Sequence, residues 1–128
     1  MNYRFAFIFL SIFFFSVSYS QQKGYYRNPC IHQNTIIFTA EGDLWKYDIN
    51  TGLSQRITTN DGLETDPIIS PDGKQIVFTG QYEGVSELYI MNIDGGVPKR
   101  ITYDFGSRYI HACSFTKDGK ILYRTSAY

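Results

Sequence analysis

The 128-residue sequence is poor in the residues from which chemical sites are built. It has two cysteines and two histidines, and they form no cluster with metal-ligand spacing. Its 12 basic and 12 acidic residues balance, so charge gives no reason to expect binding to nucleic acid or to an anionic membrane surface. No low-complexity tract occurs and no apolar period of 3.6 residues is sustained, which excludes a solenoid of helices. We therefore predict no cofactor, no metal and no nucleic-acid partner.

The first 20 residues have the layout of a secretory signal. A short basic start, Met1–Arg4, precedes the apolar run FAFIFLSIFFF at Phe5–Phe15, and the small residues Ser18 and Ser20 suit a cleavage site. The run is shorter than the roughly 20 apolar residues that a membrane-spanning helix needs. We therefore expect residues 1–20 to be removed on export to the periplasm or the extracellular space. An uncleaved anchor is the alternative, and no other membrane contact is expected.

The remaining sequence, residues 21–128, contains the same turn twice. The stretch SPDGKQIVF at Ser70–Phe78 returns as TKDGKILY at Thr116–Tyr123. An Asp-Gly pair favours a tight turn, because Gly adopts positive φ without steric cost and Asp can bond the backbone that follows it. We therefore predict that Asp72-Gly73 and Asp118-Gly119 join an innermost strand to the next strand. Their role is structural and does not involve a ligand.

Each repeat contains four short strand-like segments joined by Gly-containing turns. In chain order they are CIHQ, TIIFTA, DLWKYDI and LSQRIT, then DPIIS, QIVFTG, ELYIMNI and VPKRIT, then HACSF and ILYRTSAY. Four strands in a unit of about 40 to 45 residues are typical of a propeller blade. The sequence predicts an all-β fold, an incomplete β-propeller of four-stranded antiparallel blades. The blades lie at about 28–58, about 66–102 and, for the start of a third, about 111–128, which makes about two and a half blades.

The third strand of each unit is apolar on both faces. Leu44 and Leu88, which are 44 residues apart, lie at matching positions on one face. The opposite face carries larger residues: Trp45, Tyr47 and Ile49 in the first unit, and Tyr89, Met91 and Ile93 in the second. A blade packs against a neighbour on each side, so we expect both faces to be buried. We favour packing between blades over peptide binding as the use of Trp45 and the tyrosines.

The two cysteines lie in the innermost strands of different units. Cys30 belongs to the first unit and Cys113 to the third, so a whole blade separates them. A disulfide needs Cα atoms roughly 5 to 6 Å apart. Although export leads to an oxidising compartment, we predict two unpaired, largely buried thiols.

A search for catalytic or binding residues gives no candidate. No serine lies in a GxSxG elbow, and His32 and His111 are isolated histidines for which buried or capping roles are favoured over ligation. The segment Asn60–Asp66 has a calcium-like composition but lacks the spacing of an EF-hand loop. It is interpreted as the link from one blade to the next. We predict no catalytic, cofactor-binding or metal-binding residue in this chain.

Two stretches resemble a known family. YYRNPCIHQNTIIFTAEGDLWKYDINTG, Tyr25–Gly52, resembles the opening of tricorn-type peptidases: an Arg-Asn/His-Pro-x-Ile-His segment, an apolar strand and an Asp-Leu-Trp strand. DPIISPDGKQIVFTG, Asp66–Gly80, resembles the WD40-like repeat shared by tricorn, TolB and the propellers of some exported peptidases. The resemblance covers Gly24–Tyr128. Its opening segment is more specific to tricorn, whereas the repeat is specific only to a superfamily.

The resemblance to tricorn implies a long parent protein. In that family a six-bladed propeller gates or scaffolds the access of peptides or unfolded polypeptides to a downstream serine peptidase core, in a large homo-oligomer. The six-bladed propeller does not carry the nucleophile, and none of the family's catalytic segments occurs in this sequence. Any enzymatic activity is thus expected from the parent protein. The family is often described as cytoplasmic, but an envelope peptidase of a Gram-negative bacterium fits the export signal better.

Two other functions remain open. One is a TolB-like periplasmic propeller that acts as a protein-binding scaffold, although TolB has an α/β domain before its propeller. The other is the propeller of another exported hydrolase, such as a prolyl-oligopeptidase-like or amidohydrolase-like enzyme. No spare strand lies between the signal and Asn28, so we expect ring closure to rely on packing between the first and last blades. The 128-residue chain alone is expected to be aggregation-prone or partly disordered.

Overall fold

The described structure is built from strands. The computed structural model describes residues 24–104 and 109–126, and the predicted secretory signal at residues 1–20 lies outside them. The strands are β1 (Tyr26–His32), β2 (Thr35–Ala40), β3 (Asp43–Asp48), β4 (Leu53–Arg56), β5 (Glu64–Ile69), β6 (Gln75–Gly80), β7 (Glu87–Asn92), β8 (Lys99–Arg100), β9 (Ile110–Phe115) and β10 (Ile121–Thr125). Within the described ranges, no helix could span a membrane. The predicted all-β class is confirmed.

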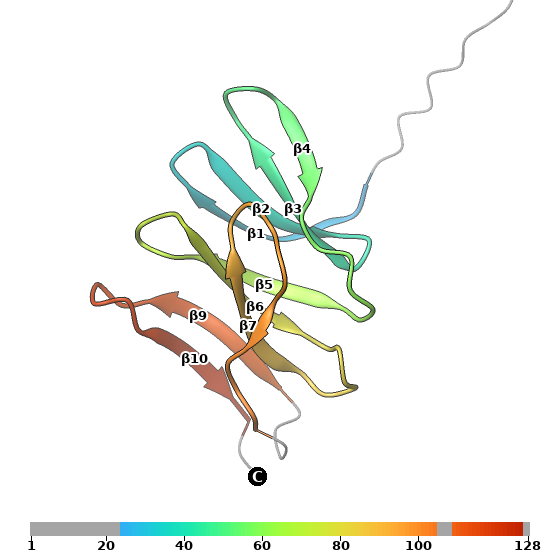
Figure 1. The fold of residues 1–128 in the computed structure, drawn as a ribbon, viewed down its shortest axis with the longest axis vertical. Coiled ribbons are helices and arrows are strands. Elements are labelled where there is room, and N and C mark those ends of the chain that lie inside the picture. Colours follow the sequence, from blue (N-terminus) through green and yellow to red (C-terminus); the bar gives the residue numbers. More distant parts are fainter. Residues whose placement is uncertain (1–23, 105–108, 127–128) are drawn as a thin grey trace, which may run out of the picture.

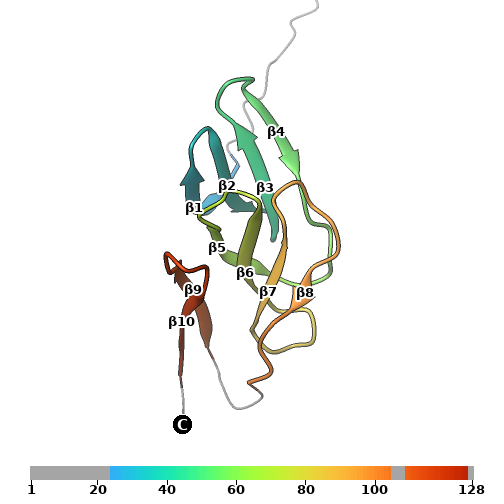
Figure 2. The ribbon, with the colours of Figure 1, turned by 60° about the vertical axis from the view of Figure 1, so that its left-hand side comes forward.

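The strands form three antiparallel sheets. Sheet one has the order β1-β2-β3-β4, sheet two has the order β5-β6-β7-β8, and sheet three pairs β9 with β10. Figures 1 and 2 show the sheets following one another in chain order, each packed against the next. The first strands of the three sheets, β1, β5 and β9, contact one another in turn. They form the inner edge of the structure, and β4 and β8 lie at the outer edge.

The predicted Asp-Gly turns are present. Gly73 has a φ of 71° between β5 and β6, and Gly119 has a φ of 80° in the matching turn of sheet three. The Asp72 carboxylate accepts hydrogen bonds from the Ser70 hydroxyl at 2.6 Å and from the Lys74 backbone N–H at 3.1 Å. Local turn chemistry therefore fixes where the innermost strand reverses.

The innermost strands are longer than the sequence predicts. β1 begins at Tyr26, whereas the pattern predicts a start at Cys30, and β5 begins at Glu64. Each strand contains a bulge, at which Asn28 has a φ of 49° and Asp66 a φ of 52°. A proline follows each of these residues. A proline in the sequence argues against a strand, and a positive φ is unusual within one. A bulge accommodates both without ending the pairing.

The fourth strand of sheet two is shorter than predicted. The segment VPKRIT, residues 97–102, pairs with β7 only at Lys99 and Arg100. Pro98 has no backbone N–H to donate, so the ladder cannot extend through it. In sheet one the matching strand β4 covers Leu53–Arg56.

Apolar side chains hold the sheets together in two layers. We call the face of a sheet that points to the preceding sheet its upstream face and the opposite one its downstream face. The first layer joins the downstream face of sheet one to the upstream face of sheet two: Ile37, Leu44 and Ile57 with Ile76, Phe78, Tyr89 and Met91. The second joins sheets two and three: Val77 and Leu88 with Ile110 and Ala112. Each fully buried large side chain contributes roughly 1.5 to 3 kcal/mol to this packing.

The two cysteines are unpaired, as predicted, but they differ in burial. Cys30 is half-buried against the first apolar layer, and burial raises the pKa of its thiol to about 11. Cys113 is exposed, so the prediction that both thiols are largely buried is wrong. Cys113 lies where the pairing of β9 shifts register, which removes it from the regular alternation of buried and exposed side chains.

Candidate functional site

The inner edge carries a row of polar side chains, one from each sheet. The side-chain amide of Asn28 on β1 donates to Oδ1 of Asp66 on β5 at 2.5 Å. Nδ1 of His111 on β9 lies 2.5 Å from Oδ2 of the same carboxylate. The hydroxyl of Thr65 donates to that oxygen at 3.0 Å. Asp66 therefore links the inner strands of all three sheets, and we call Asn28, Asp66 and His111 the inner-edge row.

An exposed aromatic and cationic group continues this row. The ring of Tyr109 lies 3.9 Å from the ring of His111, measured between centroids. The Arg124 guanidinium on β10 donates to the Tyr109 hydroxyl at 2.5 Å and lies over its ring. The inner edge thus exposes hydrogen-bonding groups beside an aromatic ring. It holds no activated nucleophile.

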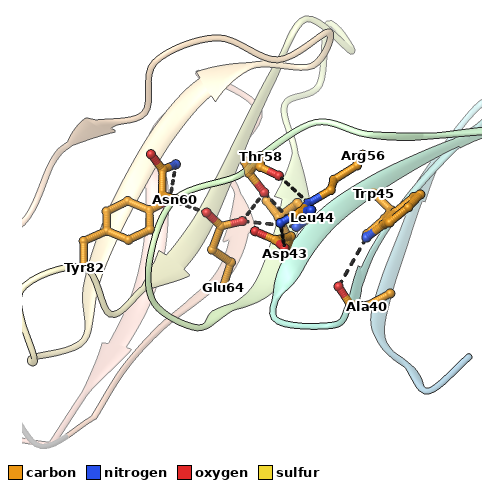
Figure 3. Close-up of polar contacts among 9 residues, drawn as sticks. All are labelled: Ala40, Asp43, Leu44, Trp45, Arg56, Thr58, Asn60, Glu64 and Tyr82. Atoms are coloured by element: carbon orange, nitrogen blue, oxygen red, sulfur yellow. Dashed lines mark hydrogen bonds and ion pairs between the residues drawn. The ribbon is translucent and has the colours of Figure 1, made fainter.

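Sheet one is tied to sheet two by a polar network in which Asp43, Thr58 and Glu64 are buried, drawn in Figure 3. At the start of β3, the Asp43 carboxylate accepts from the Arg56 guanidinium at 2.5 Å. Arg56 Nε also donates to the Thr58 carbonyl at 3.1 Å. The Thr58 hydroxyl in turn accepts from the Leu44 backbone N–H at 2.8 Å. These four residues form what we call the node of sheet one.

Glu64, the first residue of sheet two, completes the node of sheet one. It is fully buried, and one oxygen of its carboxylate accepts from the Thr58 hydroxyl and, at 3.1 Å, from the Leu44 N–H. Its other oxygen accepts from the Tyr82 hydroxyl at 2.5 Å. Burial raises the pKa of the Glu64 carboxyl, although these hydrogen bonds act in the opposite direction. A buried acid with several donors thus connects the two sheets.

Sheet two has a node at the matching positions, but residues of sheet two itself supply its hydrogen bonds. One oxygen of Glu87 accepts from the Arg100 guanidinium at 2.6 Å, and the other accepts from the Thr102 hydroxyl. The Leu88 N–H donates to the Thr102 hydroxyl at 2.8 Å. Ile110 of sheet three occupies the place that Glu64 has in sheet two, and it cannot accept a side-chain hydrogen bond. The longer Glu87 reaches both partners, whereas Asp43 reaches only the arginine.

The upstream face of sheet one forms an apolar pocket of about 460 Å³. Its walls include the aromatic side chains of Tyr26, Phe38, Trp45 and Tyr47. The indole N–H of Trp45 donates to the Ala40 carbonyl at 3.2 Å, so its polar atom is satisfied within the sheet. The pocket therefore offers mainly ring and aliphatic surface.

The structure places the two histidines in different surroundings. His32 lies against the turn at Gly73, where a Cβ atom would come within 2.9 Å of the imidazole Cδ2. His111 joins Asp66, a contact that the sequence analysis missed because the two residues are distant in sequence. The available signal was the Asn-Pro of β1 and the Asp-Pro of β5, which mark two bulges at matching positions.

Most of the segment Asn60–Asp66 forms the predicted link between one blade and the next. Its first part connects β4 to β5, and its last residues form the beginning of β5. Among the residues that the structure describes, no three His, Cys, Asp or Glu side chains are arranged to hold a metal ion.

The fold and the contacts between sheets define the class of protein. Four-stranded antiparallel sheets, joined outer strand to inner strand and packed face to face, are the blades of a β-propeller. The chain belongs to the family described as "Tricorn protease N-terminal beta propeller domain", whose model matches residues 23–128.

Similarity to individual proteins supports this family assignment. Tricorn protease homolog 1 of Streptomyces coelicolor is 33% identical over 98 residues, which are 77% of this chain and 9% of that protein. The crystal structure of the tricorn protease superposes with a TM-score of 0.67 at 32% identity, over 75% of this chain and 10% of that one. TolB from Acinetobacter baumannii gives a TM-score of 0.60 at 25% identity, over 74% and 25%. The chain thus spans a small part of these relatives.

Proposed function

We propose that this chain supplies a non-catalytic propeller that gates or scaffolds the access of peptides to a serine peptidase core elsewhere in a longer protein. Membership of the tricorn propeller family supports this role. The observation that carries it is the inner-edge row, in which Asn28 and His111, from sheets one and three, both contact the carboxylate of Asp66 on sheet two. Such a row gives the inner edge a fixed polar surface. Peptides or unfolded polypeptides are the proposed partners, and a homo-oligomer is the proposed assembly.

The exposed thiol of Cys113 on β9 allows a test in the full-length protein. A bulky maleimide is attached to Cys113, its attachment is confirmed by peptide mass, and hydrolysis of a long and a short fluorogenic peptide is compared. We expect labelling to slow hydrolysis of the long peptide more than that of the short one. Cys113→Ser, treated in the same way, is the matched control and should keep both rates. Equal rates before and after labelling would exclude gating along this edge.

A TolB-like binding scaffold is the second candidate, because the structure superposes on TolB over most of its length. The same assay separates the two functions. A full-length protein that hydrolyses no peptide at any length, yet retains a folded protein partner, would support the scaffold and reject the peptidase. Another exported hydrolase would be recognised by activity on a different substrate class.

We also propose that the protein is exported and that the signal is cleaved after Ser20. The proposal rests on the basic start and apolar run of residues 1–20. Cell fractionation followed by N-terminal sequencing tests it. A mature chain that begins at Gln21 in the periplasm or medium is expected. A membrane-bound chain that retains Phe5–Phe15 would establish an anchor instead, and a cytosolic chain would reject export.

A further inference from the structure

The junction between sheets one and two and the junction between sheets two and three are built at matching positions. In each node a leucine N–H donates to a threonine hydroxyl at 2.8 Å, and an arginine donates to the carbonyl of that threonine. These residues are Leu44, Thr58 and Arg56 in sheet one, and Leu88, Thr102 and Arg100 in sheet two. The two junctions can therefore be compared position by position.

The first residue of the following sheet is also held in the same way at both junctions. The Thr39 hydroxyl of sheet one donates to the Glu64 carbonyl at 3.0 Å. The Thr79 hydroxyl of sheet two donates to the Ile110 carbonyl at the same distance, 3.0 Å. The backbone of Glu64 and that of Ile110 thus occupy equivalent places, and only their side chains differ.

The two junctions differ in which sheet supplies the acceptor for the threonine hydroxyl. At the first junction Asp43 pairs with the arginine, and the threonine donates to Glu64 of the following sheet. At the second junction the longer Glu87 accepts from both the arginine and the threonine, and the following sheet contributes Ile110. All four side chains are buried. Each junction therefore has one carboxylate for this threonine.

The link after the second strand differs between the two sheets in a related way. In sheet one it consists of residues 41–42, between β2 and β3, and in sheet two of residues 81–86, between β6 and β7. The longer link places the ring of Tyr82 beside Tyr89, at 4.5 Å between centroids, and its hydroxyl on the second oxygen of Glu64 at 2.5 Å (Figure 3). The sheet that begins with a buried acid therefore also carries the donor for it.

Exchanged combinations of these residues would be unfavourable for two different reasons. A node with Asp43 that met an isoleucine would leave the buried threonine hydroxyl without an acceptor. A node with Glu87 that met a second glutamate would bring two buried carboxylates to one donor, where their like charges repel. Each node thus tolerates one kind of first residue in the sheet that packs on it.

We propose that the node acid of one sheet and the first residue of the next form a matched pair that specifies which sheet packs on which. Sheet two, with Glu64 and Tyr82, fits the Asp43 node of sheet one. Sheet three, with Ile110, fits the Glu87 node of sheet two. The pairs therefore oppose the exchange of sheets between two copies of the chain during folding. This inference does not depend on peptidase activity.

The test compares single and double exchanges in the full-length protein, with hydrogen exchange of residues 57–64 as the measure of local opening. Glu64→Ile removes an acceptor and Asp43→Glu adds a competing carboxylate, so each alone should raise the opening equilibrium roughly tenfold or more. The double variant copies Glu87 and Ile110 and should open within about threefold of wild type. Tyr82→Phe should increase opening in wild type but have little further effect in the double variant, where its hydroxyl has no acid to serve.

Asp94→Glu provides the matched control. It adds the same methylene group to an acid whose side chain is 81% exposed and pairs with Lys46 at the surface. It should therefore not rescue Glu64→Ile. Additive effects of Asp43→Glu and Glu64→Ile, or a double variant that does not fold, would overturn the proposal.

Refolding tests whether the pairs sort the sheets. In the double variant both junctions are of the same kind, so sheets from two copies can replace one another there. After dilution from denaturant at high protein concentration, size-exclusion chromatography should show more exchanged oligomer for the double variant than for wild type. Equal amounts would refute the sorting role.

Discussion

Glu64 is the side chain whose substitution should most selectively destabilise the junction between sheets one and two. Glu64→Gln keeps the size of the side chain but replaces one accepting oxygen with an NH2 group that can only donate. The two oxygens of Glu64 now accept from the Thr58 hydroxyl, the Leu44 N–H and the Tyr82 hydroxyl. Whichever way the new amide turns, it meets at least one donor.

The expected loss in the free energy of unfolding follows from the number of donors left without an acceptor. Leu44 keeps its hydrogen bond to the Thr58 hydroxyl at 2.8 Å, so the loss concerns Thr58 or Tyr82. A buried donor without a partner costs about 1 to 3 kcal/mol, which sets the expected loss near 2 kcal/mol. Glu83→Gln is the matched control, because Glu83 is exposed and pairs with Arg100 at the surface. It should cost about 0.5 kcal/mol or less.

Hydrogen exchange of the full-length protein, measured by mass spectrometry, detects this loss of stability in individual segments of the chain. A 2 kcal/mol change corresponds to roughly 30-fold faster exchange through local opening. We expect this acceleration in the residues 41–45 and 57–64 of Glu64→Gln, and no change there in Glu83→Gln. Unchanged exchange in both variants would refute the claim that the Glu64 carboxylate joins sheets one and two.

The same variant has a predicted pH dependence. Burial raises the pKa of Glu64 in the folded protein, so the folded state keeps this proton to a higher pH than the unfolded state. Between the ordinary pKa and the raised one, the folded state binds more protons, and the contribution of Glu64 to stability falls as the pH rises. The stability difference between wild type and Glu64→Gln should therefore shrink with rising pH through this window. A stability difference that grows with pH would contradict the predicted sign of this pH dependence.

Three further outcomes are expected. Gly73→Ala should lower the thermal midpoint more than Gly119→Ala, because both have positive φ but only at Gly73 would the new Cβ meet His32, at 2.9 Å; equal shifts in the two variants would count against a role for the histidine. Cys113 should react with a thiol reagent at pH 8 in the native protein, whereas Cys30, with a pKa raised by burial to about 11, should react only on unfolding; mass mapping of the labelled peptides decides this. The 128-residue chain produced alone should aggregate or remain partly disordered, because blade faces and strand edges stay uncovered; a monomer with one sharp melting transition would show otherwise.

The repeat and its turns could be predicted because they are local. The Asp72-Gly73 turn needs only residues that are neighbours in the chain, so the sequence places it correctly. Strand identity likewise follows from the period of two in segments such as TIIFTA, which forms β2 from Thr35 to Ala40. The family could be named from the opening segment for the same reason, since its residues are contiguous.

The inner strands show where local reasoning fails. Asn28 and Asp66 each precede a proline, and in the sequence a proline argues against a continuous paired strand. In the structure both residues have positive φ. In the structure, β2 and β6 pair on both sides of these bulges and extend the strands. The exposure of Cys113 is a similar case, because a register shift in β9 decides it.

The sequence by itself determined the β class, the turns and the repeat, because each of these depends on residues close together in the chain. Only the tertiary structure decided which polar groups meet. Asp66 joins Asn28 and His111, and Glu64 completes the node of the preceding sheet, only after the sheets have packed. A buried carboxylate must find donors wherever packing places them, and no pattern within one strand contains that information.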